Sequence, residues 1–221
     1  MTKAVIFDLD GTLLNTLGDL TAAVNHGLAA CGFPLRTEAQ VRSYLGDGVK
    51  QLIARACPPD ADETARAAVL EAYLPYYAAH NADLTRPYDG VLDLLAELKA
   101  AGIRLAVVSN KHASAVTTLC ARFFGEYLEL AVGNDGTRPL KPAPDSLLYA
   151  MERLGVTREE TWFVGDSVQD VLTARAAGVK CAAVSWGFQD EDRLLAEHPA
   201  ALARAADEVR KAVFGELGVR S

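Results

Sequence analysis

The sequence predicts an α/β fold, in which helices cover both faces of a parallel sheet and an all-helical segment is inserted after the first strand. Three observations predict it. A short apolar run near the start ends abruptly at Asp8, as a buried strand does. From residue 16 to about 83, apolar residues recur only at helical spacing. After Pro87, strand-like and helix-like segments alternate, which is the pattern of a parallel sheet.

The inserted segment is expected to be a helical cap. Gly32 and Pro34 end its first helix, and Thr37 with Gln40 has the form of a capping box that starts the second. The expected helices cover residues 16–30, 37 to the glycines at 46 and 48, 49–56 and 62–80. We therefore predict a cap domain at residues 16–83 and a catalytic core domain made of residues 1–15 and 84–221.

The core is expected to be Rossmann-like. Strands are expected at residues 3–8, 103–108, 128–132, 161–165 and 180–184, of which the third is the weakest. Helices are expected at residues 90–101, 112–123, 144–154 and 168–177, with a short and a longer one between 190 and 213. The apolar strands suit a sheet buried on both faces.

Composition narrows the class of function. The chain has 221 residues, half of them apolar, and a net charge of −7, which is typical of a globular protein and argues against a nucleic-acid partner. No apolar run approaches the ~20 residues of a membrane helix, and the first residues do not resemble a signal peptide. Four scattered cysteines favour free thiols. We expect a cytoplasmic protein, monomeric or homodimeric, without a membrane partner.

Chemically active side chains stand at the predicted carboxyl ends of the core strands and in one later loop. In an open parallel sheet, ligands bind beyond the carboxyl ends of the strands. In chain order the residues are Asp8, Asp10, Thr12, Ser109, Asn110, Lys141, Asp166 and Asp170. We expect carboxylates, a hydroxyl and a lysine to converge there on one point.

In order and spacing, these residues resemble the haloacid dehalogenase superfamily, specifically its phosphatases with a helical cap after the first strand. The matching motifs run over nearly the whole chain: Asp8-x-Asp10-Gly-Thr12, Ser109, Lys141 and Gly165-Asp166-Ser-x-x-Asp170. Within the superfamily the chain is most similar to bacterial phosphoglycolate phosphatases, on residues 44–53, 141–145 and 184–188. It departs from the pattern at Asn15, where an acidic residue is usual, which suggests a different cap motion or substrate preference.

The resemblance implies a phosphatase that works through a phosphorylated aspartate and Mg²⁺. Asp8 is the expected nucleophile. The implied Mg²⁺ ligands are a carboxylate oxygen of Asp8, the backbone carbonyl of Asp10, and Asp166, while Asp170 holds the metal-bound waters or orients Lys141. Chemistry supports this ion, because neighbouring carboxylates beside a phosphate repel one another unless a hard cation neutralises them.

One residue is expected to transfer protons, and a second group is expected to support the turn after the first strand. Asp10 can protonate the leaving oxygen and then activate the attacking water. Thr12 and the backbone amides of residues 9–11, that of Gly11 among them, can support the turn and donate to the phosphate.

Four further residues are expected to bind the substrate. Ser109 and the amide of Asn110 are predicted to bind the phosphoryl group at the start of a helix. Lys141 is predicted to stabilise the anionic transition state. Lys50, in the cap, is a candidate for binding a substrate carboxylate, which suits phosphoglycolate.

Taken singly, these residues have ordinary structural explanations. Asp-Gly is a common turn pair, Ser109 and Asp166 are suitable helix caps, and Lys141 and Lys50 are suitable surface lysines. Jointly these explanations become poor for the core residues, because each strand end would need the right residue by chance. For Lys50, an exposed helix lysine is at least as good an explanation.

The core motifs leave the substrate open, because substrate choice depends on the cap. A sugar-phosphate mutase, a sugar or nucleotide phosphatase and a pyrophosphatase are phosphoryl-transfer alternatives. An inactive scaffold whose cap binds a partner is a second alternative, which the presence of both Asp8 and Asp10 disfavours. The sequence thus predicts a Mg²⁺-dependent hydrolase of a small phosphorylated metabolite, with 2-phosphoglycolate as the expected substrate.

Overall fold

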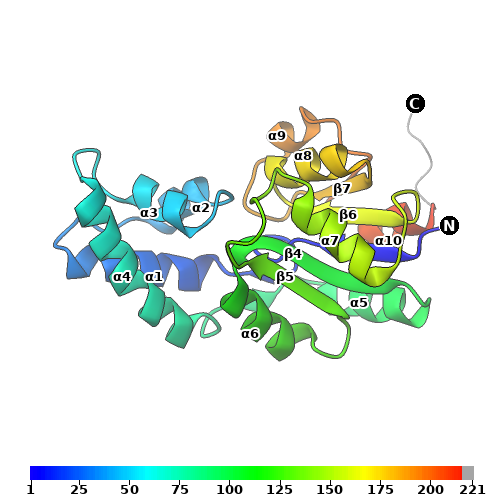
Figure 1. Ribbon diagram of the computed structural model, residues 1–221, viewed down its shortest axis with the longest axis horizontal. Coiled ribbons are helices and arrows are strands. Elements are labelled where there is room, and N and C mark those ends of the chain that lie inside the picture. The colour runs from blue at the N-terminus through cyan, green and yellow to red at the C-terminus, as the bar shows by residue number, and fades with distance from the viewer. Residues whose placement is uncertain (216–221) are drawn as a thin grey trace. The chain divides into compact units, whose positions relative to one another are not determined.

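The computed structural model describes residues 1–215, which fall into two compact units (Figure 1). The core unit comprises Met1–Leu14 and the chain from Pro87 onward, and the helical unit comprises Asn15–Arg86. The chain passes from one unit to the other through β2 (Leu14–Asn15) and returns through β3 (Arg86–Pro87), and these two strands pair with each other.

The core unit is built around a parallel six-stranded sheet. Its strand order is β5-β4-β1-β6-β7-β8, and every neighbouring pair is parallel. The strands are β1 (Ala4–Phe7), β4 (Arg104–His112), β5 (Leu130–Asn134), β6 (Thr161–Gly165), β7 (Lys180–Val184) and β8 (Ala201–Ala203). Phe7 at the end of β1 lies beside Val107 and Val164. The residues that follow β1 and β6 therefore emerge side by side at one edge of the sheet.

Helices cover both faces of this sheet, as the sequence predicts. Successive side chains of β1 point to opposite faces of the sheet. The side chain of Ile6 packs in the core beneath α7 and α8, and those of its two neighbours point to the other face. Figure 1 shows α7 and α8 on one face and α5 and α10 on the other. The core helices are α5 (Val91–Ala100), α6 (Ala113–Phe124), α7 (Asp145–Leu154), α8 (Val168–Ala177), α9 (Glu191–Leu195) and α10 (Ala206–Phe214).

The predicted elements of the core agree with the structure in most places. The strands at 161–165 and 180–184 and the helix at 168–177 have the predicted bounds. The weak strand predicted near residue 128 is β5, which pairs with β4 at the edge of the sheet. The edge strand β8 was not predicted, because its three residues, Ala-Leu-Ala, carry no strand signal of their own.

The helical unit contains four helices within Asn15–Arg86: α1 (Leu17–Ala30), α2 (Glu38–Tyr44), α3 (Val49–Ala56) and α4 (Glu63–His80). Thr37 caps α2 in the predicted capping box with Gln40. Asp62 caps α4 by accepting from the amide of Ala65. The long helices α1 and α4 pack against each other and form the main contact of this unit.

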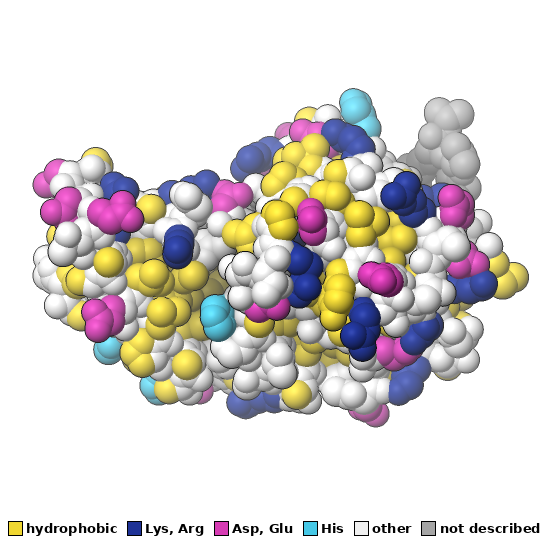
Figure 2. Space-filling view, in the orientation of Figure 1, with side chains coloured by type: hydrophobic (Ala, Val, Ile, Leu, Met, Phe, Trp, Pro, Cys, Tyr) yellow, Lys and Arg dark blue, Asp and Glu magenta, His cyan; other side chains and the backbone are white. Residues whose placement is uncertain are grey.

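Two features bear on the class of function. No helix within residues 1–215 is long and apolar enough to cross a membrane. On the face of the core unit seen in Figure 2, acidic and basic side chains are interspersed rather than gathered into a basic area.

Candidate active site

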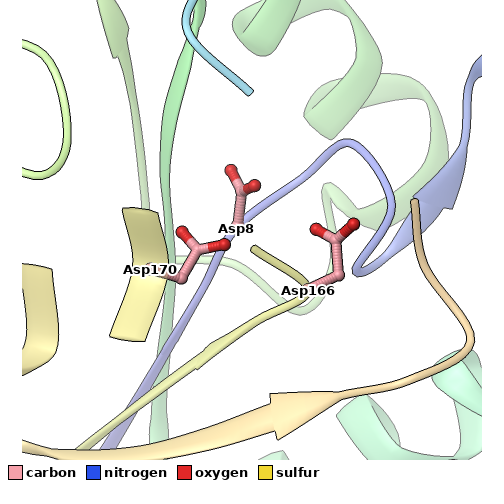
Figure 3. Close-up of side chains that lie close together, drawn as sticks. All are labelled: Asp8, Asp166 and Asp170. Atoms are coloured by element: carbon pink, nitrogen blue, oxygen red, sulfur yellow. The ribbon is translucent and has the colours of Figure 1, made fainter. Parts of the chain in front are cut away.

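Three buried aspartates gather at the carboxyl edge of the sheet. Asp8 follows β1, Asp166 follows β6, and Asp170 lies in the first turn of α8. Figure 3 shows the three side chains close together, and oxygen atoms of the three carboxylates lie within 4.8 Å of one another. The carboxylates that the sequence analysis identified thus lie together, because the carboxyl ends of parallel strands meet at the same side of the sheet.

Lys141 joins this cluster as its cation. Its Nζ lies 2.9 Å from Asp8 Oδ1 and 2.6 Å from Asp170 Oδ1, and the residue is only 6% exposed. Asn110 fixes the backbone of Lys141, because its Oδ1 accepts from Lys141 N at 2.7 Å and its Nδ2 donates to Lys141 O at 3.1 Å. The Asn110 side chain therefore positions the lysine, a role that the sequence did not suggest.

Burial dominates the electrostatics of the cluster. Burial raises the pKa of Asp8 from its ordinary 3.8 to about 6, against the opposing attraction of Lys141 and with a further increase from Asp170. Burial, followed by the charges of Asp170 and Asp8, also raises the pKa of Asp166 well above its ordinary range. For Lys141, burial alone would lower the pKa, but Asp170 and Asp8 outweigh it and the pKa is raised. The lysine is therefore charged, and the carboxyl groups of Asp8 and Asp166 ionise less readily than ordinary ones.

The cluster fits a hard divalent cation. With all groups ionised, three carboxylates face one ammonium group, so two negative charges lack compensation in a buried site. Asp8 Oδ1 is buried and accepts no well-aligned hydrogen bond, although Lys141 Nζ lies nearby. Oxygen donors of this kind suit Mg²⁺. Each of the three carboxylates could supply an oxygen to such an ion.

The carboxylate of Asp10 stands outside this acidic cluster and has its own partner. Both of its oxygens lie 2.8 Å from Lys111 Nζ, and the Lys111 side chain is only 6% exposed. No role was predicted for Lys111 from the sequence. The contact joins residues 101 positions apart, so only the pairing of β1 with β4 brings the two side chains together.

Ser109 and Asn110 lie in an irregular part of β4, and the expectation that they stand at a helix start is wrong. β4 continues to His112, which pairs with Asn134 and caps α6. Val108 pairs with Val132 on β5, and His112 pairs with Asn134. Four residues of β4 thus span the same length as two residues of β5, so the register shifts between Val108 and His112. Such bulges re-aim side chains at the ends of strands. The strand thus runs on past Ser109 and Asn110, where the sequence suggested a helix cap, and α6 begins only at Ala113.

The turn after β1 is tightly packed against Asp166. Gly11 adopts a φ of 84°, and a Cβ at this position would overlap the Asp166 carboxylate, so only glycine fits. Thr12 Oγ1 donates to Asp166 Oδ1 at 3.1 Å. The hydroxyl of Thr12 thus supports a candidate metal ligand, which differs from the expected contact with the phosphate.

Lys50 belongs to the helical unit. It is exposed in the first turn of α3, after Gly48, whose φ is 81°. Its role toward a substrate carboxylate stays a prediction.

Known proteins resemble this chain over most of its length. The sequence pattern of the haloacid dehalogenase-like hydrolases matches residues 5–184. Phosphoglycolate phosphatase 1 of Pseudomonas aeruginosa is 38% identical over 205 residues, which cover 90% of this chain and 75% of that protein. The N-acetylmuramic acid 6-phosphate phosphatase of the same organism is 36% identical over 187 residues, covering 84% of this chain and 83% of that protein.

A solved structure gives the same picture. A crystal structure from Lactobacillus delbrueckii subsp. bulgaricus, described as a candidate phosphoglycolate phosphatase, superposes with a TM-score of 0.91 at 33% identity. The match covers 96% of this chain and 99% of that one.

Proposed function

Since the chain belongs to the haloacid dehalogenase-like hydrolase family and is a phosphoric monoester hydrolase, we propose that it hydrolyses 2-phosphoglycolate with Mg²⁺ and a phosphorylated Asp8. The observation that carries the proposal is the buried cluster of Asp8, Asp166, Asp170 and Lys141. A cluster of this kind suits the neutralisation of a phosphoryl group and of the carboxylate that attacks it.

In the first step, a carboxylate oxygen of Asp8 attacks phosphorus while the bond from phosphorus to the ester oxygen breaks. Asp10 gives its proton to the departing oxygen, so the alcohol leaves neutral. Lys141 lies against Asp8 and stabilises the negative charge that spreads over the phosphoryl oxygens. Ser109 and the turn around Gly11 are the proposed donors to these oxygens.

In the second step, a water molecule attacks the phosphorus of the aspartyl-phosphate and gives its proton to Asp10. The bond from phosphorus to the Asp8 oxygen then breaks, which restores the carboxylate and releases phosphate. Lys111, which contacts both Asp10 oxygens, holds this carboxylate in place between the two steps.

Mg²⁺ would be held by the carboxylates of Asp8 and Asp166 and by the backbone carbonyl of Asp10. When bound, it supplies the positive charge that lets the carboxylate and the phosphate approach each other. Asp170 is 2.6 Å from Lys141 Nζ, which favours its role as the residue that orients this lysine.

The helical unit, in this proposal, is the cap that selects the substrate. The names of relatives support two substrate classes, phosphoglycolate and a sugar phosphate. The first is our proposal, because phosphoglycolate phosphatases recur among the relatives. A phosphatase of sugar 6-phosphates is the second candidate, favoured by the 36% identity to the N-acetylmuramic acid 6-phosphate phosphatase.

The test is phosphate release from a panel of monoesters, in Mg²⁺ and in EDTA. The panel contains 2-phosphoglycolate, N-acetylmuramic acid 6-phosphate, other sugar phosphates, nucleotides and pyrophosphate. We expect the highest kcat/KM with 2-phosphoglycolate and background rates in EDTA. Faster hydrolysis of another ester would discard the substrate while keeping the chemistry. No release from any ester would overturn the proposal and revive the inactive scaffold.

Lys50 is tested by its effect on one substrate only. If it binds the carboxylate of 2-phosphoglycolate, Lys50→Ala raises KM for this substrate and leaves that for glycerol 2-phosphate, which has no carboxylate, unchanged. Gln51→Ala, an exposed neighbour on α3, is the matched control. An equal change in KM for both substrates would mean that Lys50 does not bind the substrate carboxylate.

The proposed setting is the cytoplasm, where the substrate is a small phosphorylated metabolite. All four cysteines are free thiols, and three of them are buried, which suits a reducing compartment.

A further inference from the structure

The loop that follows β7 touches Asp166 directly. We call residues 185–188 the β7 loop. The backbone N–H of Phe188 donates to Asp166 Oδ2 at 2.7 Å. The other oxygen, Oδ1, accepts from Thr12 Oγ1 at 3.1 Å. The Asp166 carboxylate, in a residue only 2% exposed, is thus held from two different segments of the chain.

Glycine at position 187 is required by this packing. A Cβ added there would overlap Asp166 and the backbone oxygen of Gly11. A Cβ added at Gly11 would overlap the same carboxylate from the turn after β1. Gly11 and Gly187 therefore lie on either side of the Asp166 side chain. At both positions the backbone is so close to this side chain that no residue with a Cβ would fit.

Trp186 ties the β7 loop to the turn after β1. Its Nε1 donates to the backbone oxygen of Thr12 at 3.1 Å. The indole ring also lies near Tyr88, with 6.5 Å between ring centroids. The contacts form a closed circuit: Trp186 holds the Thr12 backbone, the Thr12 hydroxyl holds Asp166, and Asp166 accepts from Phe188.

We propose that the β7 loop is a positioning element for the metal: Trp186 and Gly187 fix the orientation of Asp166 in which this carboxylate binds Mg²⁺. The inference rests on the proposed function, because it takes Asp166 as a Mg²⁺ ligand. Groups that hydrogen-bond a metal ligand fix its orientation, and their removal typically weakens metal binding about 10–100-fold. Trp186 and Gly187 are positioning residues here and touch no reacting atom.

The test measures the Kd of the full-length, substrate-free protein for Mg²⁺ alone, by isothermal titration calorimetry. Trp186→Phe keeps an aromatic ring but removes the N–H that Thr12 accepts, and it is expected to raise this Kd about tenfold, at the low end of that range. Gly187→Ala forces Asp166 or the loop to move and is expected to raise the Kd by more, up to about 100-fold. Trp162→Phe is the matched control. Trp162 lies earlier on β6, where its ring faces Lys180, and its loss is expected to leave the Kd unchanged.

Thermal unfolding of each variant in EDTA separates positioning from simple packing. If the β7 loop only fills space, Trp186→Phe lowers the unfolding temperature and leaves the Kd for Mg²⁺ within twofold of the wild type, which would overturn the inference. Because Trp186→Phe is the milder change, it decides the matter even if Gly187→Ala does not fold. A wild-type protein that binds no Mg²⁺ would overturn the metal part of the proposed function, whereas equal binding by wild type and variants would overturn only this inference.

Discussion

Asp8 is the residue in which burial and charge compete most directly. Burial of its carboxylate favours the protonated form, while Lys141 at 2.9 Å favours the ionised one. Burial is the larger effect and leaves the pKa at about 6. A carboxylate in this balance is ionised at neutral pH yet weakly solvated, which is the state that a nucleophile requires.

Asp10 is predicted to affect the chemical step alone. Asp10→Asn keeps the size of the side chain and an oxygen for Lys111, but it carries no transferable proton. We expect kcat to fall by roughly 10²–10⁴-fold, the usual contribution of general acid–base catalysis. Steady-state kinetics measure this loss. A kcat within tenfold of the wild type would exclude Asp10 as the acid and base.

The same variant carries an internal control. Asp10 is expected to bind Mg²⁺ through its backbone carbonyl, so the Kd for Mg²⁺ of Asp10→Asn should match that of the wild type. Weaker binding would show that the side chain also serves the metal.

Some site residues could be predicted from the sequence because they directly follow predicted strands, in the chain order of the family's motifs. Asp8, Asp166 and Asp170 follow two neighbouring strands, and their convergence requires only that the strands be parallel and adjacent. The contact of Lys111 with Asp10 comes from a residue that lies where the register of β4 with β5 shifts. That shift in the register between β4 and β5 is an irregularity that no local pattern in the sequence predicts.

At the scale of single elements, Asp19 joins the start of α1 to the chain that leaves the helical unit. It is 3% exposed and accepts from the backbone N–H of Leu84 and Thr85 and from Thr85 Oγ1, at 2.7–3.1 Å. A buried carboxylate is costly unless it is hydrogen-bonded, and these donors meet that need. The contact fixes the two ends of the helical unit beside each other.

Asp19→Asn is therefore predicted to destabilise the protein. An amide offers one acceptor oxygen in place of two and places its NH₂ group against backbone donors. We expect the free energy of unfolding to fall by about 3 kcal/mol, which is typical of a broken buried network of hydrogen bonds to a charged group. Urea denaturation measures it, with Asp60→Asn, an exposed site of the same unit, as the control. Equal stability of the two variants would contradict the assignment.

Element boundaries could be predicted where the residues act locally. Thr37 with Gln40 and Ser167 with Asp170 form capping boxes that start α2 and α8, and such boxes depend only on neighbours in the chain. β8 could not be predicted in this way, because its hydrogen bonds come from β7. The residues of β8 favour a helix by composition, and the sheet edge overrides that preference.

At the scale of the whole molecule, the site makes stability depend on pH and on metal. In the metal-free protein the folded-state pKa of Asp8 is about 6, against 3.8 for the ordinary carboxyl. Between these pH values the folded state binds more protons than the unfolded state, so the contribution of Asp8 to stability falls as pH rises from about 4 to about 6. Above pH 6 the ionised Asp8 costs roughly 3 kcal/mol.

This sign gives a prediction about Asp8→Asn in EDTA. We expect the variant to be more stable than the wild type at pH 7, by up to about 3 kcal/mol, and to lose this advantage below pH 4. Urea denaturation at several pH values measures the difference, with Asp60→Asn as the control. Saturating Mg²⁺ should reduce or reverse it, because the ion stabilises only a protein that binds it. A variant less stable than the wild type at pH 7 in EDTA would contradict the electrostatic account of the site.

The most direct test of the account is the rate of phosphate release by Asp8→Asn in saturating Mg²⁺. The substrate is the monoester that the wild-type enzyme hydrolyses fastest, and Asp8→Ala, which cannot revert by deamidation, is assayed beside it. We expect both variants to release phosphate at the background rate while circular dichroism shows an intact fold. Release by either folded variant at a rate within tenfold of the wild type would mean that Asp8 is not the nucleophile.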